Sequence, residues 1–320
     1  MPETIHKGSC FTPPLSHSTI TLGVPAYNEA KFIRQTLESI QAQTHKDFAV
    51  LISDNASTDG TQAICERIAS QDPRFTYVRH PKNIGASSNF NFLRESTASP
   101  YFAWVGGHDM LHPDYLRNHL AALNADLGIG NSFSYWEFVN ESDEIVRRGC
   151  DTGIATPRTG ALLRYLWSAG LTVDLGPMHG VFRRKFLCKL PIHNCFACDH
   201  IMLSNSLYLA PFKSIPGHLY RLRDFDESRR AQNVMQRITG QEKSAPDMHA
   251  TIAGYLADFD KIVPEGSWHR HLKPFFSWIL YDRFVRRGFR VTTLARSILK
   301  RIHDIKRLYG GSSSCTSTAK

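Results

Sequence analysis

The sequence predicts an α/β fold, a Rossmann-like mixed but mainly parallel sheet flanked by helices. The 320 residues are 42% hydrophobic and 21% charged, which is typical of a globular protein and excludes a disordered or collagenous chain. Apolar β-prone runs alternate with segments whose apolar residues recur at helical spacing. One run, Phe48–Ser53, is continuously apolar, as expected for a strand buried on both faces. This alternation favours parallel strands joined by right-handed helical crossovers.

The first half of the chain supplies strand and helix candidates in alternation. The strands are short β-rich or apolar runs: Thr19–Val24, Phe48–Ser53, Phe75–Arg79 and Tyr101–Val105. The helices follow them in turn: Glu29–Gln43, a helix that begins near Ser57–Asp59 and presents Ile64 and Ile68, Ser87–Glu95, and Pro113–Leu123. Capping residues at Ser57–Asp59 and a proline at the first position of the last helix support these starts.

The second half is less regular. We expect strands at Gly128–Val139, Glu144–Arg148 and Leu219–Arg223, helices at Thr159–Ala169 and Asp199–Leu209, and an exposed loop or short helix over Arg221–Gln241. The chain divides into a flexible extension (1–18), a folded domain (19–225) with halves at 19–125 and 126–225, a helical C-terminal extension (226–309) and a flexible tail (310–320).

Three features predict a cytoplasmic chain. The first eighteen residues hold three prolines and no apolar h-region, so they do not resemble a signal peptide. No run approaches the length of a membrane-spanning helix, and the nearest, Phe275–Tyr281, is far too short. The seven cysteines are odd in number and are not dense enough for a secreted disulfide scaffold.

Four loops of the first half carry unusual composition. In parallel sheets, ligands bind beyond the carboxyl ends of the strands. The loops at those ends are Pro25–Glu29, Asp54–Gly60, His80–Gly85 and Gly106–Asp109. Together they hold carboxylates, amides, a histidine and an aromatic ring. Such a set suits a ligand with a base and a metal-bound phosphate.

The loop motifs resemble those of the family 2 glycosyltransferases. Neither G-x-G-x-x-G nor a loop ending in G-K-[S/T] follows the first strand, which argues against the common nucleotide-binding loops. The first loop instead reads P-A-Y-N-E from Pro25, and the second reads D-N-A-S-T-D-G-T from Asp54. Asn83-x-Gly85 and G-G-H-D-M-L-H-P from Gly106 fall where the third and fourth family motifs lie. The resemblance covers roughly residues 19 to 223.

The resemblance implies a GT-A fold and an inverting transfer from a nucleotide-diphospho-sugar, in cell-surface polysaccharide or glycolipid synthesis. Residues 19–125 would be the nucleotide-sugar half and residues 126–225 the acceptor half. The implied donor-binding residues are Pro25, Tyr27, Glu29, Asp54, Asn83 and Asp109. Tyr27 would lie against the base, and Asp54 would accept a hydrogen bond from its imino N–H. That bond favours uracil or thymine, which carry this donor, and hence UDP- or dTDP-sugars.

The fourth motif departs from the common D-x-D-D form of the family. Gly106 and His108 stand where the family has aspartates, and Asp109 matches. The resemblance implies that His108 and Asp109 hold a divalent metal ion that neutralises charge on the departing diphosphate. An imidazole ligand favours Mn²⁺ while leaving Mg²⁺ open. The alternative is that His108 only caps the following helix and Asp109 alone holds the ion.

The resemblance also implies a base near the acceptor hydroxyl. Family members place this carboxylate at the start of a helix, ahead of an arginine-bearing strand. Asp199 opens the Asp199–Leu209 helix, and Leu219–Arg223 follows as the strand. A carboxylate there can remove the hydroxyl proton. A simple acid matching the helix dipole is the alternative.

Other interpretations stay open. Cys195-x-x-Cys198 has zinc-ligand spacing, but no second such pair occurs, and lone cysteines are more often buried apolar residues. A sugar-phosphate nucleotidyltransferase would need a glycine- and Lys/Arg-rich first loop, which Pro25–Glu29 is not. The third interpretation is a transferase-like binding protein that lost activity along with the carboxylate at position 106.

The net charge of +9 lies at one end of the chain. Residues 266–310 hold eleven Lys and Arg and two Asp, which is 11 − 2 = +9, so the remaining residues sum to zero. The predicted helix there has an apolar face and a basic back. This favours either a peripheral helix on the cytoplasmic face of an anionic membrane, near a glycan or lipid-linked acceptor, or packing on the catalytic domain. Charge confined to one end argues against a nucleic-acid groove.

Overall fold

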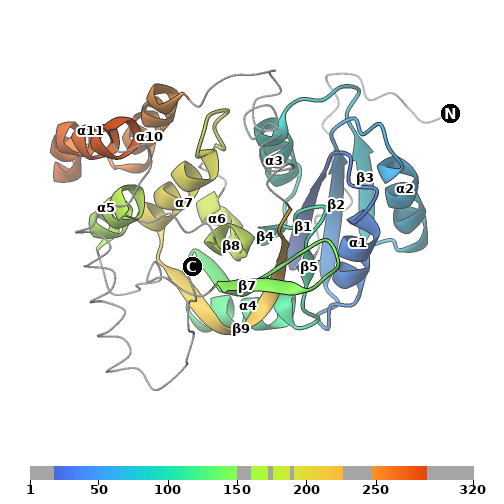
Figure 1. Cartoon of the computed structure of the whole chain (residues 1–320). Coiled ribbons are helices and arrows are strands. Elements are labelled where there is room, and N and C mark those ends of the chain that lie inside the picture. The colour runs from blue at the N-terminus through green and yellow to red at the C-terminus, as the bar shows by residue number, and fades with distance from the viewer. Residues whose placement is uncertain (1–17, 150–159, 172–175, 188–190, 226–246, 287–320) are drawn as a thin grey trace.

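The computed structural model describes residues 18–149, 160–171, 176–187, 191–225 and 247–286. Its sheet is mixed, and its longer ladders are parallel (Figure 1). The strands run in the order β3-β2-β1-β4-β8-β6-β9-β5, with β7 paired to β6. Their bounds are β1 Ile20–Ala26, β2 Phe48–Asp54, β3 Phe75–Arg79, β4 Tyr101–Trp104, β5 Met110–Leu111, β6 Asn131–Val139, β7 Ile145–Gly149, β8 Val181–Arg183 and β9 Phe212–Arg223.

Helices flank the sheet, as expected for this fold class (Figure 1). Those of the first half are α1 Ile33–Gln41, α2 Thr61–Gln71, α3 Ala86–Glu95 and α4 Tyr115–Ala125. Those of the second half are α5 Ala161–Leu171, α6 Arg184–Leu187, α7 Cys198–Leu209, α10 Met248–Ile262 and α11 Lys273–Tyr281, with shorter turns η1 Gly176–His179, η2 Trp268–Leu272 and η3 Asp282–Arg286. None of the described helices is long and apolar enough to cross a membrane.

Strand β2, which lies between β3 and β1, is buried on both faces, as its sequence predicts. All seven of its residues are buried. Leu51 packs into the apolar cluster that holds Phe102 and Trp104, whereas Val50 and Ile52 belong to the cluster on the opposite side. The alternation of strand side chains therefore divides one apolar run between two cores.

Several element boundaries differ from the prediction. The helix expected at Glu29–Gln43 begins at Ile33, because the carbonyl of Glu29 closes a turn by accepting the N–H groups of Phe32 and Ile33. Residues Arg221–Arg223, which overlap the expected loop or short helix, belong to β9. The rest of that loop beyond 225, and the basic helix after 286, lie outside the described residues. The domain boundaries stay predictions.

One buried histidine makes stability depend on pH. His119 of α4 is fully buried, with Nδ1 2.9 Å from the Ser132 hydroxyl oxygen, and burial lowers its pKa to about 3. In the unfolded chain, His119 would be protonated below about pH 6.5, while the folded state keeps it neutral. Stability should therefore fall as pH drops from about 6.5 toward 3, by up to about 1.4 kcal/mol per unit. Urea unfolding at several pH values would measure this slope.

The control for this prediction is a matched pair of variants. In His119→Gln the slope below pH 6.5 should become shallower than in the wild type. The change His249→Gln, at an exposed histidine of α10, should leave the slope unchanged. Parallel slopes for the wild type and His119→Gln would contradict the assignment.

Candidate functional site

The loops after β1 and β2 are tied together by hydrogen bonds. Asn28, in a left-handed conformation (φ 56°), donates its N–H to the Ser57 hydroxyl at 3.0 Å. Its side-chain oxygen accepts the N–H of Thr58 at 2.8 Å. The Ala30 N–H donates to Asp59 at 3.0 Å. The motif residues of the two loops therefore hold one conformation together.

Asp54 lies at the end of β2 and is fully buried. One carboxylate oxygen accepts the N–H and hydroxyl of Ser57 at 2.8 and 2.6 Å. The other accepts the Tyr77 hydroxyl at 2.6 Å and the Arg79 guanidinium at 3.3 Å. Burial and the hydrogen bond that the Tyr77 hydroxyl donates to Asp54 raise the pKa of Tyr77. Four donors from the protein thus surround the carboxylate that the family resemblance assigns to the nucleotide base.

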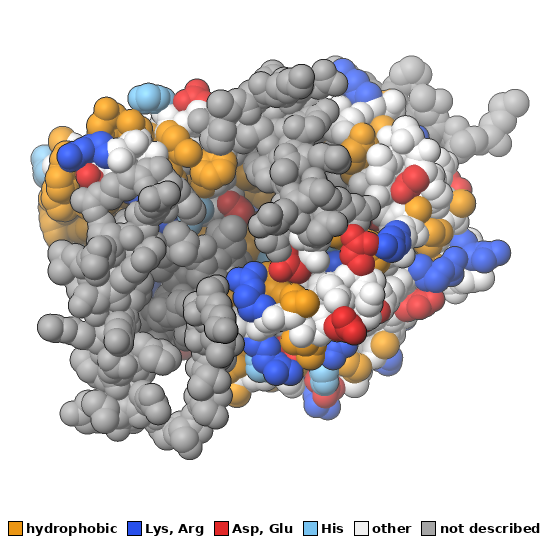
Figure 2. Space-filling view, in the orientation of Figure 1, with side chains coloured by type: hydrophobic (Ala, Val, Ile, Leu, Met, Phe, Trp, Pro, Cys, Tyr) orange, Lys and Arg blue, Asp and Glu red, His pale blue; other side chains and the backbone are white. Residues whose placement is uncertain are grey.

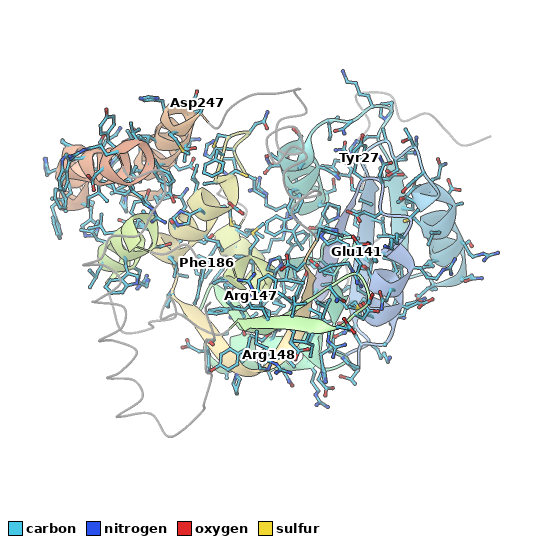
Figure 3. The ribbon with its side chains drawn as sticks, in the orientation of Figure 1. Tyr27, Glu141, Arg147, Arg148, Phe186 and Asp247 are labelled. Carbon is cyan, nitrogen blue, oxygen red and sulfur yellow. The ribbon has the colours of Figure 1, made fainter. Side chains whose placement is uncertain are left out.

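The other predicted donor-binding residues lie around these loops. Tyr27 is exposed at the upper end of the sheet (Figure 3), and Pro25 is half-buried at the end of β1. Asn83 is exposed, and its side-chain oxygen accepts the Asn55 amide at 2.9 Å and the Gly85 N–H at 2.8 Å. Asn55 therefore positions Asn83 just before α3.

Glu29 and His108 meet across the sheet edge. Nδ1 of His108 lies 2.9 Å from a carboxylate oxygen of Glu29, although the residues are 79 positions apart. Nε2 of His108 lies 3.9 Å from a carboxylate oxygen of Asp109. A carboxylate that accepts Nδ1–H fixes the tautomer in which Nε2 carries the lone pair. Metal-binding histidines commonly have this arrangement.

Asp109 is directed toward β9. One of its oxygens accepts the Arg223 N–H and the other the Tyr220 hydroxyl, both at 3.0 Å. The carboxylate is almost fully buried. The Tyr220 hydroxyl also accepts the N–H of Gly106 at 3.3 Å. These contacts anchor the 106–109 loop to the last strand. No pattern in the sequence indicated the Tyr220–Asp109 contact.

Arg223 is a second anchor that the motifs did not single out. Its guanidinium is buried and donates to the carbonyls of His108 (3.1 Å) and Asn140 (2.8 Å) and to the Asp143 carboxylate (2.7 Å). It also lies over the Phe32 ring at 4.2 Å. Arg223 therefore joins the His108 loop to α1 and to the β6–β7 hairpin.

Gly106, where the family motif has its first aspartate, leaves little room for a side chain. A Cβ atom at Gly106 would lie 2.5 Å from Oδ2 of Asp109, the oxygen that accepts from Tyr220. Gly106→Ala should therefore push the carboxylate away from its partners and lower the free energy of unfolding by about 1–3 kcal/mol. Urea unfolding checks this prediction. Gly160→Ala is the matched control, because its Cβ would meet no atom within 4 Å. Equal losses in both variants would contradict the steric explanation.

Asp199 lies in the first turn of α7 and is half-buried. One of its oxygens accepts the His200 N–H at 2.8 Å. Burial raises the pKa of Asp199, which makes the carboxylate a better proton acceptor near neutral pH. The neighbouring Cys198 Sγ lies 3.8 Å from the Ser87 hydroxyl in the first turn of α3. The start of α7 therefore lies beside the helix that follows Asn83.

The cysteine pair shows no metal geometry. Cys195 is buried and Cys198 half-buried, both are free thiols, and burial raises the pKa of Cys195 to about 11 and that of Cys198 to about 12. Within the described ranges, no three His, Cys, Asp or Glu side chains are grouped as for a metal ion. Both thiols therefore favour the protonated form.

The family is decided by a sequence match over more than half of the chain. The profile of Glycosyl transferase family 2 matches residues 21–190. The chain belongs to this family. It is 31% identical over 127 residues to glycosyltransferase GlyA of Streptococcus pneumoniae, covering 39% of this chain and 18% of GlyA. It is 31% identical over 120 residues to the putative glycosyltransferase EpsH of Bacillus subtilis, covering 37% of this chain and 35% of EpsH. The matches thus span well under half of these relatives.

Solved structures confirm the GT-A fold of this family 2 glycosyltransferase. TarS 1–349 of Staphylococcus aureus, in complex with UDP-GlcNAc, superposes with a TM-score of 0.62 at 15% identity, covering 83% of this chain and 72% of TarS. The mannosyltransferase PcManGT of Pyrobaculum calidifontis, in complex with GDP-Man and Mn²⁺, gives a TM-score of 0.50 at 18% identity, covering 95% and 85%. The prediction of a mainly parallel GT-A fold is therefore confirmed.

Proposed function

We propose that this transferase moves a sugar, with inversion, from a nucleotide-diphospho-sugar to an acceptor hydroxyl in cell-surface polysaccharide or glycolipid synthesis. One observation carries the proposal. The Glu29 carboxylate orients the His108 ring, and Asp199 in the first turn of α7 is a carboxylate of raised pKa. The first suits a diphosphate leaving group, and the second suits an attacking hydroxyl.

The donor base is assigned to the loops after β1 and β2. The exposed Tyr27 ring offers a stacking surface, with Pro25 and Asn83 nearby in the same set of loops. The imino N–H of uracil or thymine would donate to Asp54 in place of Arg79, whose 3.3 Å bond is the longest of the four to that carboxylate. This assignment favours UDP- or dTDP-sugars.

A divalent cation, Mn²⁺ or Mg²⁺, is assigned to His108 as part of this proposal. Nε2 of His108 would be the protein ligand, and the Glu29 carboxylate would hold the ring in place through Nδ1. Few protein ligands suffice, because the donor's phosphates supply others. The contacts of Asp109 with β9 favour a role in positioning the loop over its predicted role as a ligand. When bound, the cation supplies positive charge that stabilises the departing diphosphate.

Asp199 is assigned the role of general base. The acceptor oxygen forms a bond to the anomeric carbon as the bond from that carbon to the diphosphate oxygen breaks. The hydroxyl proton passes to a carboxylate oxygen of Asp199, and the bonding electrons leave with the diphosphate. Attack from the face opposite the leaving group inverts the anomeric centre.

A nucleotide-sugar screen tests the function. The purified chain is incubated with UDP-, dTDP-, GDP- and CMP-sugars with and without Mn²⁺, and thermal shift and nucleotide release are measured. We expect a cation-dependent shift and slow release with a UDP- or dTDP-sugar. Binding without release, even when acceptors are added, would favour a transferase-like binding protein. Pyrophosphate exchange with a sugar phosphate would favour a nucleotidyltransferase.

A further inference from the structure

The C-terminal helices present a row of exposed aromatic side chains. Four large aromatic residues are between 46% and 63% exposed: Trp268, Phe275, Trp278 and Tyr281. Phe275 and Trp278 stack on each other with ring centres 6.0 Å apart. We call these four residues the aromatic face. Figure 2 shows apolar side chains gathered at the left edge of the molecule, over α10 and α11.

The aromatic face is not a displaced part of the core. The opposite side of α11 already fills the core with Phe276 and Leu280, and Phe284 of η3 adds to it. The Phe276 ring lies 4.8 Å from that of Tyr165 and 5.4 Å from that of Phe259. Since α11 is fixed by this inner side, its outward aromatic rings are held on the surface by the fold.

The chain segment that carries the aromatic face is basic in sequence. Asp260 pairs with Lys273 at 2.5 Å, and Asp282 pairs with Arg286 at 3.3 Å, so each of these acids is offset by one base. Residues 266–310 carry the whole formal net charge of the chain, +9. A second copy of this chain would bring the same positive charge against itself, which disfavours self-association through this face.

We propose that the aromatic face binds the surface of an anionic lipid bilayer. Tryptophan and tyrosine rings are favoured at the boundary between headgroups and acyl chains, where the ring is apolar and the polar atom stays hydrated. Basic residues near the bilayer add attraction to anionic headgroups. Aromatic insertion and basic charge together form the two-part signal that stable peripheral binding requires.

Helix α11, which carries most of the aromatic face, is linked to the helix of Asp199 through α10. Tyr255 of α10 contacts His200 and Ser204 of α7, and the Thr251 hydroxyl donates to the Phe196 carbonyl at 2.8 Å, just before α7. Tyr255 also packs against Phe276 of α11, with ring centres 6.1 Å apart. If the proposed function holds, the bilayer would therefore lie at a fixed distance from the base, as a lipid-linked acceptor requires.

Vesicle flotation with the full chain tests the proposal without donor or acceptor, so its outcome does not depend on transfer activity. Vesicles of phosphatidylcholine alone are compared with vesicles that also contain phosphatidylglycerol. We expect binding to the anionic vesicles only. The double change Phe275→Ser and Trp278→Ser should weaken that binding by about tenfold or more. The control Leu127→Ser, at a 69% exposed leucine before β6, should bind like the wild type.

Two further measurements identify other occupants of the face. Brominated acyl chains should quench tryptophan fluorescence in the wild type and less in Trp278→Phe. Binding without such quenching would show that the face is covered, and would overturn the proposal. Wild-type dimers that dissociate in the double variant would identify a second copy as the occupant. Unchanged thermal unfolding in the double variant confirms that lost binding is not lost folding.

Discussion

Asp199→Asn is expected to lower the rate of transfer by about 10²–10⁴-fold while donor affinity stays unchanged. The amide keeps the size and the acceptor oxygen that receives the His200 N–H. It cannot take up the proton of the acceptor hydroxyl, so the chemical step loses its base. Transfer is measured as product formed from a saturating nucleotide-sugar, and donor affinity by calorimetry.

The matched control is Asp247→Asn. Asp247 caps α10, is exposed, and accepts the N–H groups of His249 and Ala250. The Asp247→Asn variant should retain full transfer, because the Asp247 carboxylate only caps the start of α10. If Asp199→Asn kept wild-type turnover, or lost donor binding together with turnover, the assignment of the base would be wrong.

The pH profile of transfer gives a second readout for the same residue. Burial raises the pKa of Asp199, so the deprotonated base is lost at a higher pH than for an exposed aspartate. The apparent rate kcat/KM should fall as pH decreases through that raised pKa and level off above it. The acid limb should disappear in Asp199→Asn, whose residual rate does not depend on this proton.

His108→Ala is expected to reduce transfer by about 10²-fold or more and to weaken Mn²⁺ binding in the presence of UDP. The change removes Nε2, the atom that we propose as the metal ligand. The change Glu29→Gln removes the carboxylate that contacts Nδ1 of His108. It should reduce transfer by a smaller factor, about 10–100-fold, because it disturbs only the orientation of the imidazole ring. Titration followed by the Mn²⁺ electron paramagnetic resonance signal measures the affinity directly.

His108→Asp supplies the informative comparison. A carboxylate at this position restores the oxygen ligand that the common family motif has, and should shift the preference from Mn²⁺ toward Mg²⁺. The control Lys82→Ala, at an exposed residue of the His80–Gly85 loop, should not alter the metal preference. Equal Mn²⁺ affinity in the wild type and in His108→Ala would exclude the imidazole as a ligand.

The parts of the fold that could be predicted are those set by local patterns. The run Phe48–Ser53 predicts a strand and forms one in which every residue is buried, and the β-prone run Phe75–Arg79 forms the edge strand β3, in which Phe75 is buried. The start of α1 was expected four residues too early, because the turn closed by Glu29 leaves no mark in the apolar spacing. The two-residue strand β5 likewise gives no periodic signal.

The candidate site shows the same limit. Motif spacing indicated that Glu29 and His108 lie at one sheet edge, but their mutual contact depends on side-chain directions that spacing does not determine. The direction of Asp109 toward Tyr220 and Arg223 depends on a strand more than a hundred residues later. The roles of Asp199, Tyr27 and Asn83 in the reaction stay predictions.

The contact of Asp109 with β9 affects the order in which parts of the chain fold during synthesis. The donor loops come from the first 109 residues, yet the last of them is held by Tyr220 and by the backbone of Arg223. Contacts between residues so distant in sequence form late, because the intervening chain must first be closed into a loop. During synthesis, a chain shorter than about 223 residues therefore cannot complete the contacts that hold the 106–109 loop. Competence to split a nucleotide-sugar would then arise only after the acceptor half has folded.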